Sequence, residues 1–340
     1  MKNILITGGA GFIGSNFIPL FLEKNQNVNV INLDALTYAS DIDNLKDCHS
    51  SSRYSFIEGD IRDKNLIKSI FSKYDISGVI HFAAESHVDN SIDSPDIFIE
   101  TNINGTFNLL HNAYLHWMDG PFNLKENHNH SKFLHVSTDE VYGSLGETGL
   151  FSESTPYAPN SPYSASKASS DMLVRSYRET YGMQTLITNC SNNYGPKQHK
   201  EKLIPKIIHN AINGEQIPIY GDGKNVRDWL FVLDHCNGID LVFKKGEYGQ
   251  VYNIGGKNEM TNINIVQTIC KILDQKLPKE KSYSELITFV EDRAGHDRRY
   301  AIDASKIEEK IGWKAQENFS SGINLTIDWY LNKLSKKTKI

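Results

Sequence analysis

The sequence predicts an α/β protein in which a Rossmann-type, doubly wound parallel sheet carries a smaller, mixed α/β C-terminal domain. Residues 1–60 alternate strand, turn, helix and strand, with apolar strands expected at 4–6 and 28–33 and a helix at 12–24. The alternation continues to about residue 188. A glycine-rich turn joins the first strand to the first helix, at the place where doubly wound sheets bind ligands.

The later elements follow the same pattern. Strands are expected at 54–57, 78–82, 132–136 and 184–188, and helices at 64–73 and from about 94 to 117. After residue 189 the alternation loosens, and residues 251–254 read as a strand that returns to the first sheet. We therefore predict one domain of residues 1–189 with a return segment at about 226–255, and a second of residues 190–225 and 256–340.

Composition excludes several classes of protein. The 340 residues are 39 % hydrophobic and 23 % charged, which is typical of folded chains and excludes disordered or fibrous ones. A net charge of -5 argues against a nucleic-acid partner. No segment approaches the roughly 18 apolar residues of a membrane span, so we expect a cytoplasmic protein without a membrane partner.

No metal site is expected. The four cysteines, Cys48, Cys190, Cys236 and Cys270, are widely spaced, without the pairing of zinc ligands or of a disulfide framework. Residues 120–131 are polar and lack a helical or strand period, which indicates a surface loop. His128 and His130 lie in that loop, and we expect them to be solvated side chains.

The glycine-rich turn indicates dinucleotide binding. Gly8, Gly11 and Gly14 follow a predicted strand and open a predicted helix, where bare backbone can approach a pyrophosphate. Asp34 ends the second strand, twenty residues beyond Gly14. A carboxylate there accepts hydrogen bonds from ribose hydroxyls and repels a 2′-phosphate, which favours NAD over NADP.

Two further motifs suggest chemistry. Tyr163 and Lys167 stand four residues apart behind Ser161 and Pro162, an expected N-cap and first helical residue, so the ammonium can stabilise a phenolate. The residues Thr138-Asp139-Glu140 follow an apolar strand, and two carboxyl groups in different environments suit acid and base roles.

These segments together resemble the NAD-dependent extended short-chain dehydrogenase/reductases, and among them the nucleotide-sugar 4,6-dehydratases. The resemblance covers almost the whole chain and is carried by TGGAGFIG from Thr7, HFAAESHVD from His81, STDEVYG from Ser137, YSASK from Tyr163, NCSNNYGP from Asn189, EKLIP from Glu201, RDWLFV from Arg227 and GHDRRYAID from Gly295. Ala35 stands where the family has lysine, and Ala294 where proline is common.

The resemblance implies which residues serve each purpose. Those expected to contact a tightly bound NAD are Gly8, Gly11, Phe12, Ile13, Gly14, Asp34, Ala35, Leu36, Thr37, Asp60, Ile61, Phe82, Ala83, Ala84, Ser86, Thr101, Tyr163, Lys167 and Asn193. Those expected to contact the nucleotide-sugar are Ser86, Thr138, Asn192, Lys202, Leu203, Pro218, Ile219, Tyr220, Arg227, Asn262, Asp292, Arg293, Ala294, Gly295 and His296.

The implied reaction is oxidation at C4, elimination of water across C5 and C6, and return of the hydride to C6. Its catalytic residues are Thr138, Asp139, Glu140, Tyr163 and Lys167. The resemblance favours dTDP-glucose as substrate and a homodimer formed by the helices around residues 95–117 and 165–181. A UDP- or CDP-glucose dehydratase, a nucleotide-sugar 4-epimerase and a non-catalytic NAD-binding regulatory protein stay open as alternatives.

Overall fold

The computed structural model of the chain describes residues 1–292 and 297–337. Its central element is a seven-stranded sheet in which every neighbouring pair is parallel, so the predicted fold class is confirmed. The strands, in spatial order, are β12 (Val251–Ile254), β8 (Thr185–Cys190), β7 (Lys132–Thr138), β4 (Ile76–His81), β1 (Lys2–Thr7), β2 (Val28–Asp34) and β3 (Tyr54–Glu58).

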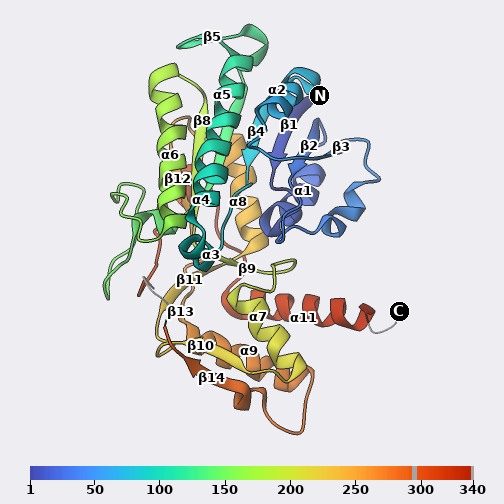
Figure 1. The fold of residues 1–340 in the computed structure, drawn as a ribbon, viewed down its shortest axis with the longest axis vertical. Helices are drawn as coiled ribbons and strands as arrows, with labels where there is room; N and C mark the ends of the chain where they lie inside the picture. Colours follow the sequence, from blue (N-terminus) through green and yellow to red (C-terminus); the bar gives the residue numbers. More distant parts are fainter. Residues whose placement is uncertain (293–296, 338–340) are drawn as a thin grey trace.

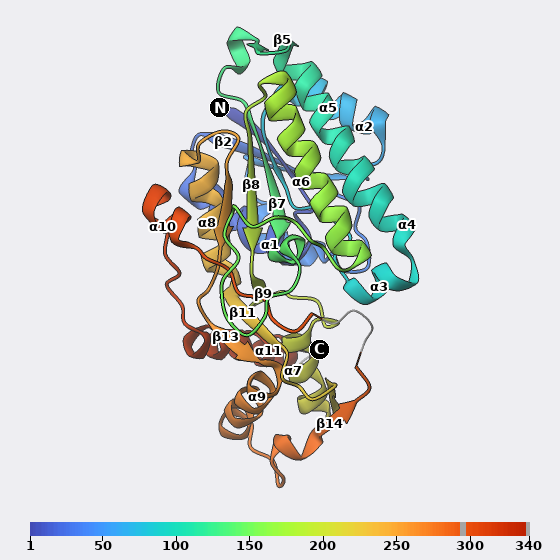
Figure 2. The same cartoon turned by 90° about the vertical axis from the view of Figure 1, so that its left-hand side faces the viewer.

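Helices cover both faces of this sheet. The helices α1 (Phe12–Lys24) and α8 (Val232–Lys245) pack on one face, and α2 (Lys64–Tyr74), α5 (Thr106–Trp117) and α6 (Pro162–Tyr181) on the other (Figures 1 and 2). Successive side chains of β1 enter opposite layers, because Ile4 and Ile6 join the first and Leu5 the second. Strands buried on both faces explain the continuous apolar runs in the sequence.

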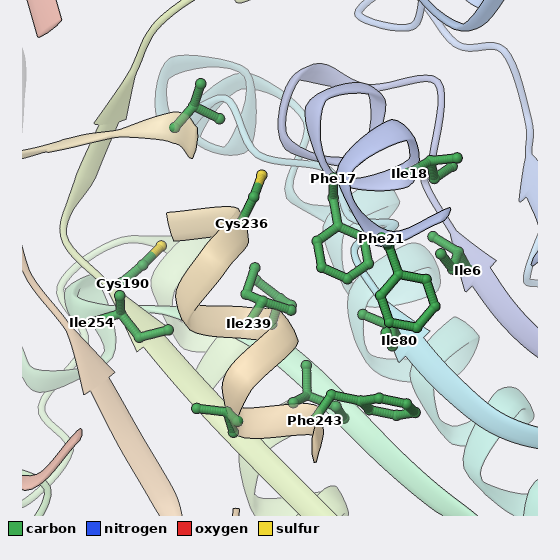
Figure 3. Close-up of a cluster of buried hydrophobic side chains, with 14 of the residues drawn as sticks. Ile6, Phe17, Ile18, Phe21, Ile80, Cys190, Cys236, Ile239, Phe243 and Ile254 are labelled. Carbon is green, nitrogen blue, oxygen red and sulfur yellow. The ribbon is translucent and has the colours of Figure 1, made fainter. Parts of the chain in front are cut away.

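The layer beneath α1 and α8 is rich in aromatic rings. Phe21 of α1 meets Phe243 of α8 edge to face, with ring centroids 6.1 Å apart, and Phe17 stacks on Phe21 (Figure 3). Ile239 of α8 fills the same cluster. This packing fixes α1, and with it the glycine turn, against the sheet.

The strand order indicates where a ligand site is expected in this sheet. The chain moves from β1 to β2 and β3 on one side, and later elements add β4, β7 and β8 on the other. The order therefore reverses between β1 and β4. Doubly wound sheets bind ligands at such a point, outside the carboxyl ends of the strands.

The remaining elements form a second cluster below those strand ends (Figure 2). Its largest helices are α7 (Leu203–Asn213), α9 (Asn262–Lys276) and α11 (Phe319–Lys337). Its strands are β9 (Asn192–Tyr194), β11 (Val226–Phe231) and β13 (Glu259–Thr261) in one sheet and β10 (Ile217–Tyr220) and β14 (Ile287–Val290) in another. In contrast, the short α10 (Ser305–Ile311) packs with α8.

Two strands bear on the domain division. β12 pairs with β8 in the large sheet, and β11 pairs with β9 and β13 outside it. The chain thus crosses between the two parts more than once. The domain boundaries given above stay a prediction.

The helix expected from about 94 to 117 is not continuous. It consists of α4 (Pro95–Phe98), a π-helical turn over Ile99–Gly105 and α5, and it is preceded by α3 (Val88–Asp93). The π turn places Asn102 inside the protein, where its amide group donates hydrogen bonds to the carbonyl oxygen of Glu85 and to Ser166. These contacts are the physical reason for the irregularity, which helical periodicity cannot reveal.

The segment expected as a surface loop is also more ordered than predicted. It contains the hairpin strands β5 (Met118–Gly120) and β6 (Asn123–Leu124) and a short 3-10 turn over Glu126–His128. His130 is exposed as expected, but the interpretation of His128 as solvated is wrong, since its side chain is 3 % exposed. Its Nδ1 lies 3.0 Å from Oγ of Ser131, and its ring packs on His116.

All four cysteines are buried and unpaired. Within the described ranges, no helix is both long and apolar enough to span a membrane.

Candidate active site

One cavity of about 330 Å³ lies at the carboxyl edge of the sheet, and it contains most of the predicted site residues. It brings together Gly8, Gly11, Phe12, Ile13, Gly14, Asp34, Ala35, Thr37, Asp60, Ile61, Phe82, Ala83, Ala84, Ser86, Thr101, Thr138, Asp139, Glu140, Tyr163, Lys167, Asn192, Asn193 and Lys202. Most of these residues come from the carboxyl ends of β1, β2, β3, β4 and β7 and from the starts of α1 and α6, while Asn192 and Asn193 begin β9, Thr101 lies in the π turn and Lys202 precedes α7.

The glycine turn fits a phosphate-bearing ligand. Gly8 has φ +73°, and a Cβ there would lie 2.6 Å from the backbone nitrogen of Ala83. A Cβ on Gly14 would lie 2.4 Å from the carbonyl oxygen of Gly8, so the turn packs tightly against both α1 and β4. Gly11 is the N-cap of α1, and no side chain of the described chain caps it. The first amides of α1 are therefore available to an anion in the cavity.

Asp34 also holds the turn itself. Its carboxylate accepts hydrogen bonds from the backbone nitrogens of Ala10 at 2.8 Å and Leu36 at 2.9 Å, and from Oγ of Ser40 at 2.9 Å. A carboxylate has about four acceptor positions, so three are already used. Asp34 therefore orders the turn around it as well as lining the cavity.

Thr138, Asp139 and Glu140 form the turn that follows β7. Asp139–Tyr142 is a single 3-10 turn, and Oγ1 of Thr138 accepts a hydrogen bond from the backbone nitrogen of Glu140. Asp139 is 1 % exposed, whereas Glu140 is half-buried. The two carboxyl groups therefore lie in different environments although they are adjacent in sequence.

Burial gives Asp139 the properties of an acid. It raises the pKa of that carboxyl well above its ordinary value, the negative charges of Glu140 and Asp228 raise it further, and Arg227 lowers it. The protonated form of Asp139 is thus favoured over what an exposed aspartate would show at the same pH. A carboxyl with a raised pKa beside a second, more exposed carboxyl is an arrangement suited to the acid and base roles of an elimination.

Tyr163 is the second residue of α6, in the first turn as predicted. Ser161 is the N-cap, forms a capping box with Ser164, and is followed by Pro162 at the first helical position. Tyr163 is almost fully buried, and burial and then Glu140 raise the pKa of its phenol, while a hydrogen bond with Thr138 lowers it. The expectation that Lys167 favours a phenolate stays a prediction.

Lys167 is held by β7. Its Nζ donates a hydrogen bond to the carbonyl oxygen of Val136 at 2.9 Å and lies 3.2 Å from Nε2 of His135. Nε2 of His135 lies 3.4 Å from Oδ1 of Asp171, one helical turn beyond Lys167 on α6. Burial lowers the pKa of Lys167 to about 8, against the opposing charge of Asp171.

Some predicted substrate residues lie outside the lining of this cavity. Pro218, Ile219 and Tyr220 form β10, Leu203 begins α7, Asn262 begins α9, and Asp292 follows β14. Leu36, which was expected to contact NAD, also lies outside the lining, and its backbone nitrogen donates a hydrogen bond to Asp34. The side chain of Ile219 is buried in the apolar cluster, so only its backbone is available to a ligand. Arg293, Ala294, Gly295 and His296 lie outside the described residues.

Arg227 links the second cluster to the catalytic turn. Its guanidinium donates hydrogen bonds to the carbonyl oxygens of Val226 and Asp297 and lies over the ring of Tyr300, 4.3 Å from the centroid. It is also close enough to Asp139 to lower the pKa of that carboxyl. An arginine so placed can bind an anionic group that enters from the second cluster.

Sequence analysis missed several residues of the cavity lining. Ser40 and Arg62 are two of them, and Arg62 donates two hydrogen bonds to Oδ2 of Asp60. Arg62 follows β3 as Asp34 ends β2, so the carboxyl ends of consecutive parallel strands were the signal that could have identified it.

The fold and the site define a dinucleotide-binding enzyme with a Tyr-Lys pair and an acid and base pair in one cavity. The sequence model of the family described as GDP-mannose 4,6 dehydratase matches residues 5–326. The chain belongs to this family.

Individual proteins similar to this chain include dehydratases of nucleotide-sugars. The dTDP-glucose 4,6-dehydratase of Xanthomonas campestris pv. campestris (strain B100) is 53 % identical over 97 % of this chain and 93 % of its own length. A dTDP-glucose 4,6-dehydratase of Streptomyces venezuelae, crystallised with NAD, superposes with a TM-score of 0.88 at 43 % identity, covering 98 % of both chains. A UDP-glucose 4-epimerase of Thermotoga maritima has a TM-score of 0.85 at 28 % identity, covering 98 % of this chain and 100 % of its own.

Proposed function

We propose that this protein is an NAD-dependent dTDP-glucose 4,6-dehydratase, a hydro-lyase that converts dTDP-glucose to dTDP-4-keto-6-deoxyglucose and water. The observation that carries the reaction type is the pair Asp139 and Glu140 in the same cavity as Tyr163, because Asp139 is buried with a raised pKa and Glu140 is half-buried. The fold alone does not distinguish a dehydratase from an epimerase, because a UDP-glucose 4-epimerase superposes on this chain nearly as well as a dehydratase does. An epimerase needs neither an acid at C6 nor a base at C5.

Each residue has a role in the proposed reaction. NAD, when bound, supplies the hydride acceptor for C4 and the hydride donor for C6. Tyr163 takes the proton of the C4 hydroxyl, and the ketone that forms acidifies the C5 proton. Glu140 removes that proton, and Asp139 protonates the C6 hydroxyl, which leaves as water. Glu140 returns its proton to C5, Tyr163 releases the proton it took to solvent, and Asp139 regains a proton from solvent, so the cycle closes without net gain or loss of protons.

The proposed cofactor site lies in the cavity, and the proposed nucleotide-sugar site extends beyond its lining into the second cluster. The turn from Gly8 to Gly14, with Asp34, is the proposed NAD site, and Arg227 with β10 and the start of α9 form the proposed nucleotide-sugar site. The domain division at residue 189 would then separate cofactor from substrate binding. The remaining residues implied by the family pattern, including Arg293 to His296, belong to the same proposed sites.

A homodimer in the cytoplasm completes the proposal. Ile99, Phe107 and Met172 are large apolar side chains of the π turn, α5 and α6, and each is at least 40 % exposed. The helices α5 and α6 pack side by side on the outer face of the sheet (Figure 2). A second copy of the chain would cover them, and light scattering of the purified protein tests this.

The experiment that tests the function compares nucleotide-sugars. The enzyme is incubated with dTDP-, UDP-, CDP- and GDP-glucose, and formation of the 4-keto sugar is followed. We expect turnover with dTDP-glucose in clear preference to the others. Preference for another base overturns the substrate assignment, and epimerisation without loss of water overturns the reaction type. Tyr163→Phe is the control, because it should remove product with every substrate.

A further inference from the structure

Three side chains of metal-ligand type converge at the amino end of β4, away from the cavity. They are Asp75 at the end of α2, His116 on α5 and His128 in the 3-10 turn of the β5–β6 segment, residues 118–131. Nε2 of His116 lies 3.2 Å, and Nε2 of His128 3.4 Å, from the same Oδ1 of Asp75. All three ligand atoms lie within 4.8 Å of one another.

The distances from Asp75 to the two histidines are those of ligands in a tetrahedral zinc site. With bonds of about 2.0 to 2.1 Å, two ligand atoms of such a site lie about 3.3 Å apart, close to both distances. Two imidazoles and one carboxylate are ligand types that Zn²⁺ takes, and a fourth position stays open to water. The side chain of Asp75 is 71 % exposed, so an ion can enter from solvent.

The most buried ligand is held by a second contact. The other ring nitrogen of His128, Nδ1, lies 3.0 Å from Oγ of Ser131, and this contact directs Nε2 towards Asp75. Metal-bound histidines are generally fixed through their second nitrogen in this way. Lys125 is the nearby cation, and its Nζ donates to the carbonyl oxygens of Leu115 and His116 at the end of α5.

Asp75 is an unexpected residue at its position. It is the C-cap of α2 with φ +45°, a left-handed conformation that glycine or asparagine usually adopts at this point. Its negative charge also lies at the negative end of the helix dipole. A divalent cation between the three side chains offsets that charge, which hydrogen bonds from neutral imidazoles do not.

We propose that Asp75, His116 and His128 bind one Zn²⁺ ion, with water as the fourth ligand. The ion connects the β5–β6 segment to the junction of α2 and β4, and it is structural. β4 has six residues and separates this site from the cavity by about 20 Å of strand, so the ion takes no part in the dehydratase reaction.

The test uses the full chain after treatment with a chelator. Co²⁺ is the spectroscopic probe, because its visible absorption distinguishes tetrahedral from octahedral coordination. We expect one equivalent of Co²⁺ to give a tetrahedral spectrum that Zn²⁺ abolishes, and Zn²⁺ to raise the unfolding temperature. Asp75→Asn and His116→Gln should each weaken binding by about tenfold or more.

The control is His130→Gln, an exposed histidine of the same segment, which should bind as the wild type does. Asp75 and His116 are chosen for substitution because neither is fully buried, so their variants should fold. An octahedral cobalt spectrum, or unchanged binding in both Asp75→Asn and His116→Gln, overturns the proposal.

Discussion

Nζ of Lys167 lies 3.2 Å from Nε2 of His135, in an interior where both side chains are almost fully buried. Behind the imidazole, Asp171 receives hydrogen bonds from Ser137 and Tyr157. Burial raises the pKa of Asp171 to about 7, and the charge of Lys167 opposes that rise. The carboxyl of Asp171 is therefore a positioning group that favours the charged form of Lys167.

Asp171→Asn should shift the pH profile. Because the negative charge of Asp171 raises the pKa of Lys167, its removal should lower that pKa further below about 8. The alkaline limit of kcat should then move to lower pH. Ser137→Ala is the matched control, since it removes a hydrogen bond to Asp171 and keeps the carboxylate. An unchanged profile for Asp171→Asn would show that Lys167 does not depend on it.

Asp139→Asn and Glu140→Gln should separate the two halves of the reaction. Neither residue is needed for oxidation at C4, so both variants should still reduce bound NAD when substrate is added. Elimination should fall by about 10²-fold or more, the usual effect of losing a positioned acid or base. Absorbance of the reduced nicotinamide and release of the 4-keto-6-deoxy sugar measure the two halves. Equal loss of both halves would contradict the assigned roles.

Asp139 should also make stability depend on pH. Burial raises the folded-state pKa of Asp139 above the unfolded value of 3.8, so the folded protein holds the carboxyl proton more tightly than the unfolded chain does. The free energy of unfolding therefore falls as pH rises from 3.8 towards the folded-state pKa. Asp139→Asn cannot ionise. The free energy of unfolding of this variant, relative to the wild type, should therefore increase as pH rises above 3.8 and up to the folded-state pKa of Asp139, by at most about 1.4 kcal/mol per pH unit. A constant difference in denaturant titrations would refute the raised pKa.

Asp34 should affect both cofactor choice and stability. NAD should restore activity to stripped wild-type enzyme much better than NADP, because the carboxylate repels a 2′-phosphate. Asp34→Ala should weaken NAD binding and lower the free energy of unfolding by about 1–3 kcal/mol, since three donors lose their acceptor. Ser40→Ala, which removes one of the three hydrogen bonds, is the control. Equal restoration by NAD and NADP would exclude this role.

Glycine turns, helix caps and apolar runs in the sequence predicted the ends of several helices and strands correctly. The helix expected at 12–24 begins and ends where α1 does, and Ser161 and Pro162 cap α6 as expected. The predicted strand at 251–254 coincides with β12. The residues expected at strand ends meet in one cavity, because the carboxyl ends of parallel strands share one edge of the sheet.

Contacts between distant segments account for what the sequence did not reveal. The π turn depends on Asn102 reaching Glu85 and Ser166, and the burial of His128 depends on Asp75 and on His116 of α5. Periodicity describes one segment at a time, so it cannot show such partners.

Transfer of deuterium from C4 of the substrate tests the central claim most directly. Wild-type enzyme is given dTDP-glucose labelled at C4, and the product is examined by NMR and mass spectrometry. The proposed dehydratase uses one bound cofactor for both oxidation and reduction, so the label should appear at C6 with no net consumption of NAD. Loss of the label to solvent, or one NAD consumed per product, would contradict this account and indicate a simple dehydrogenase.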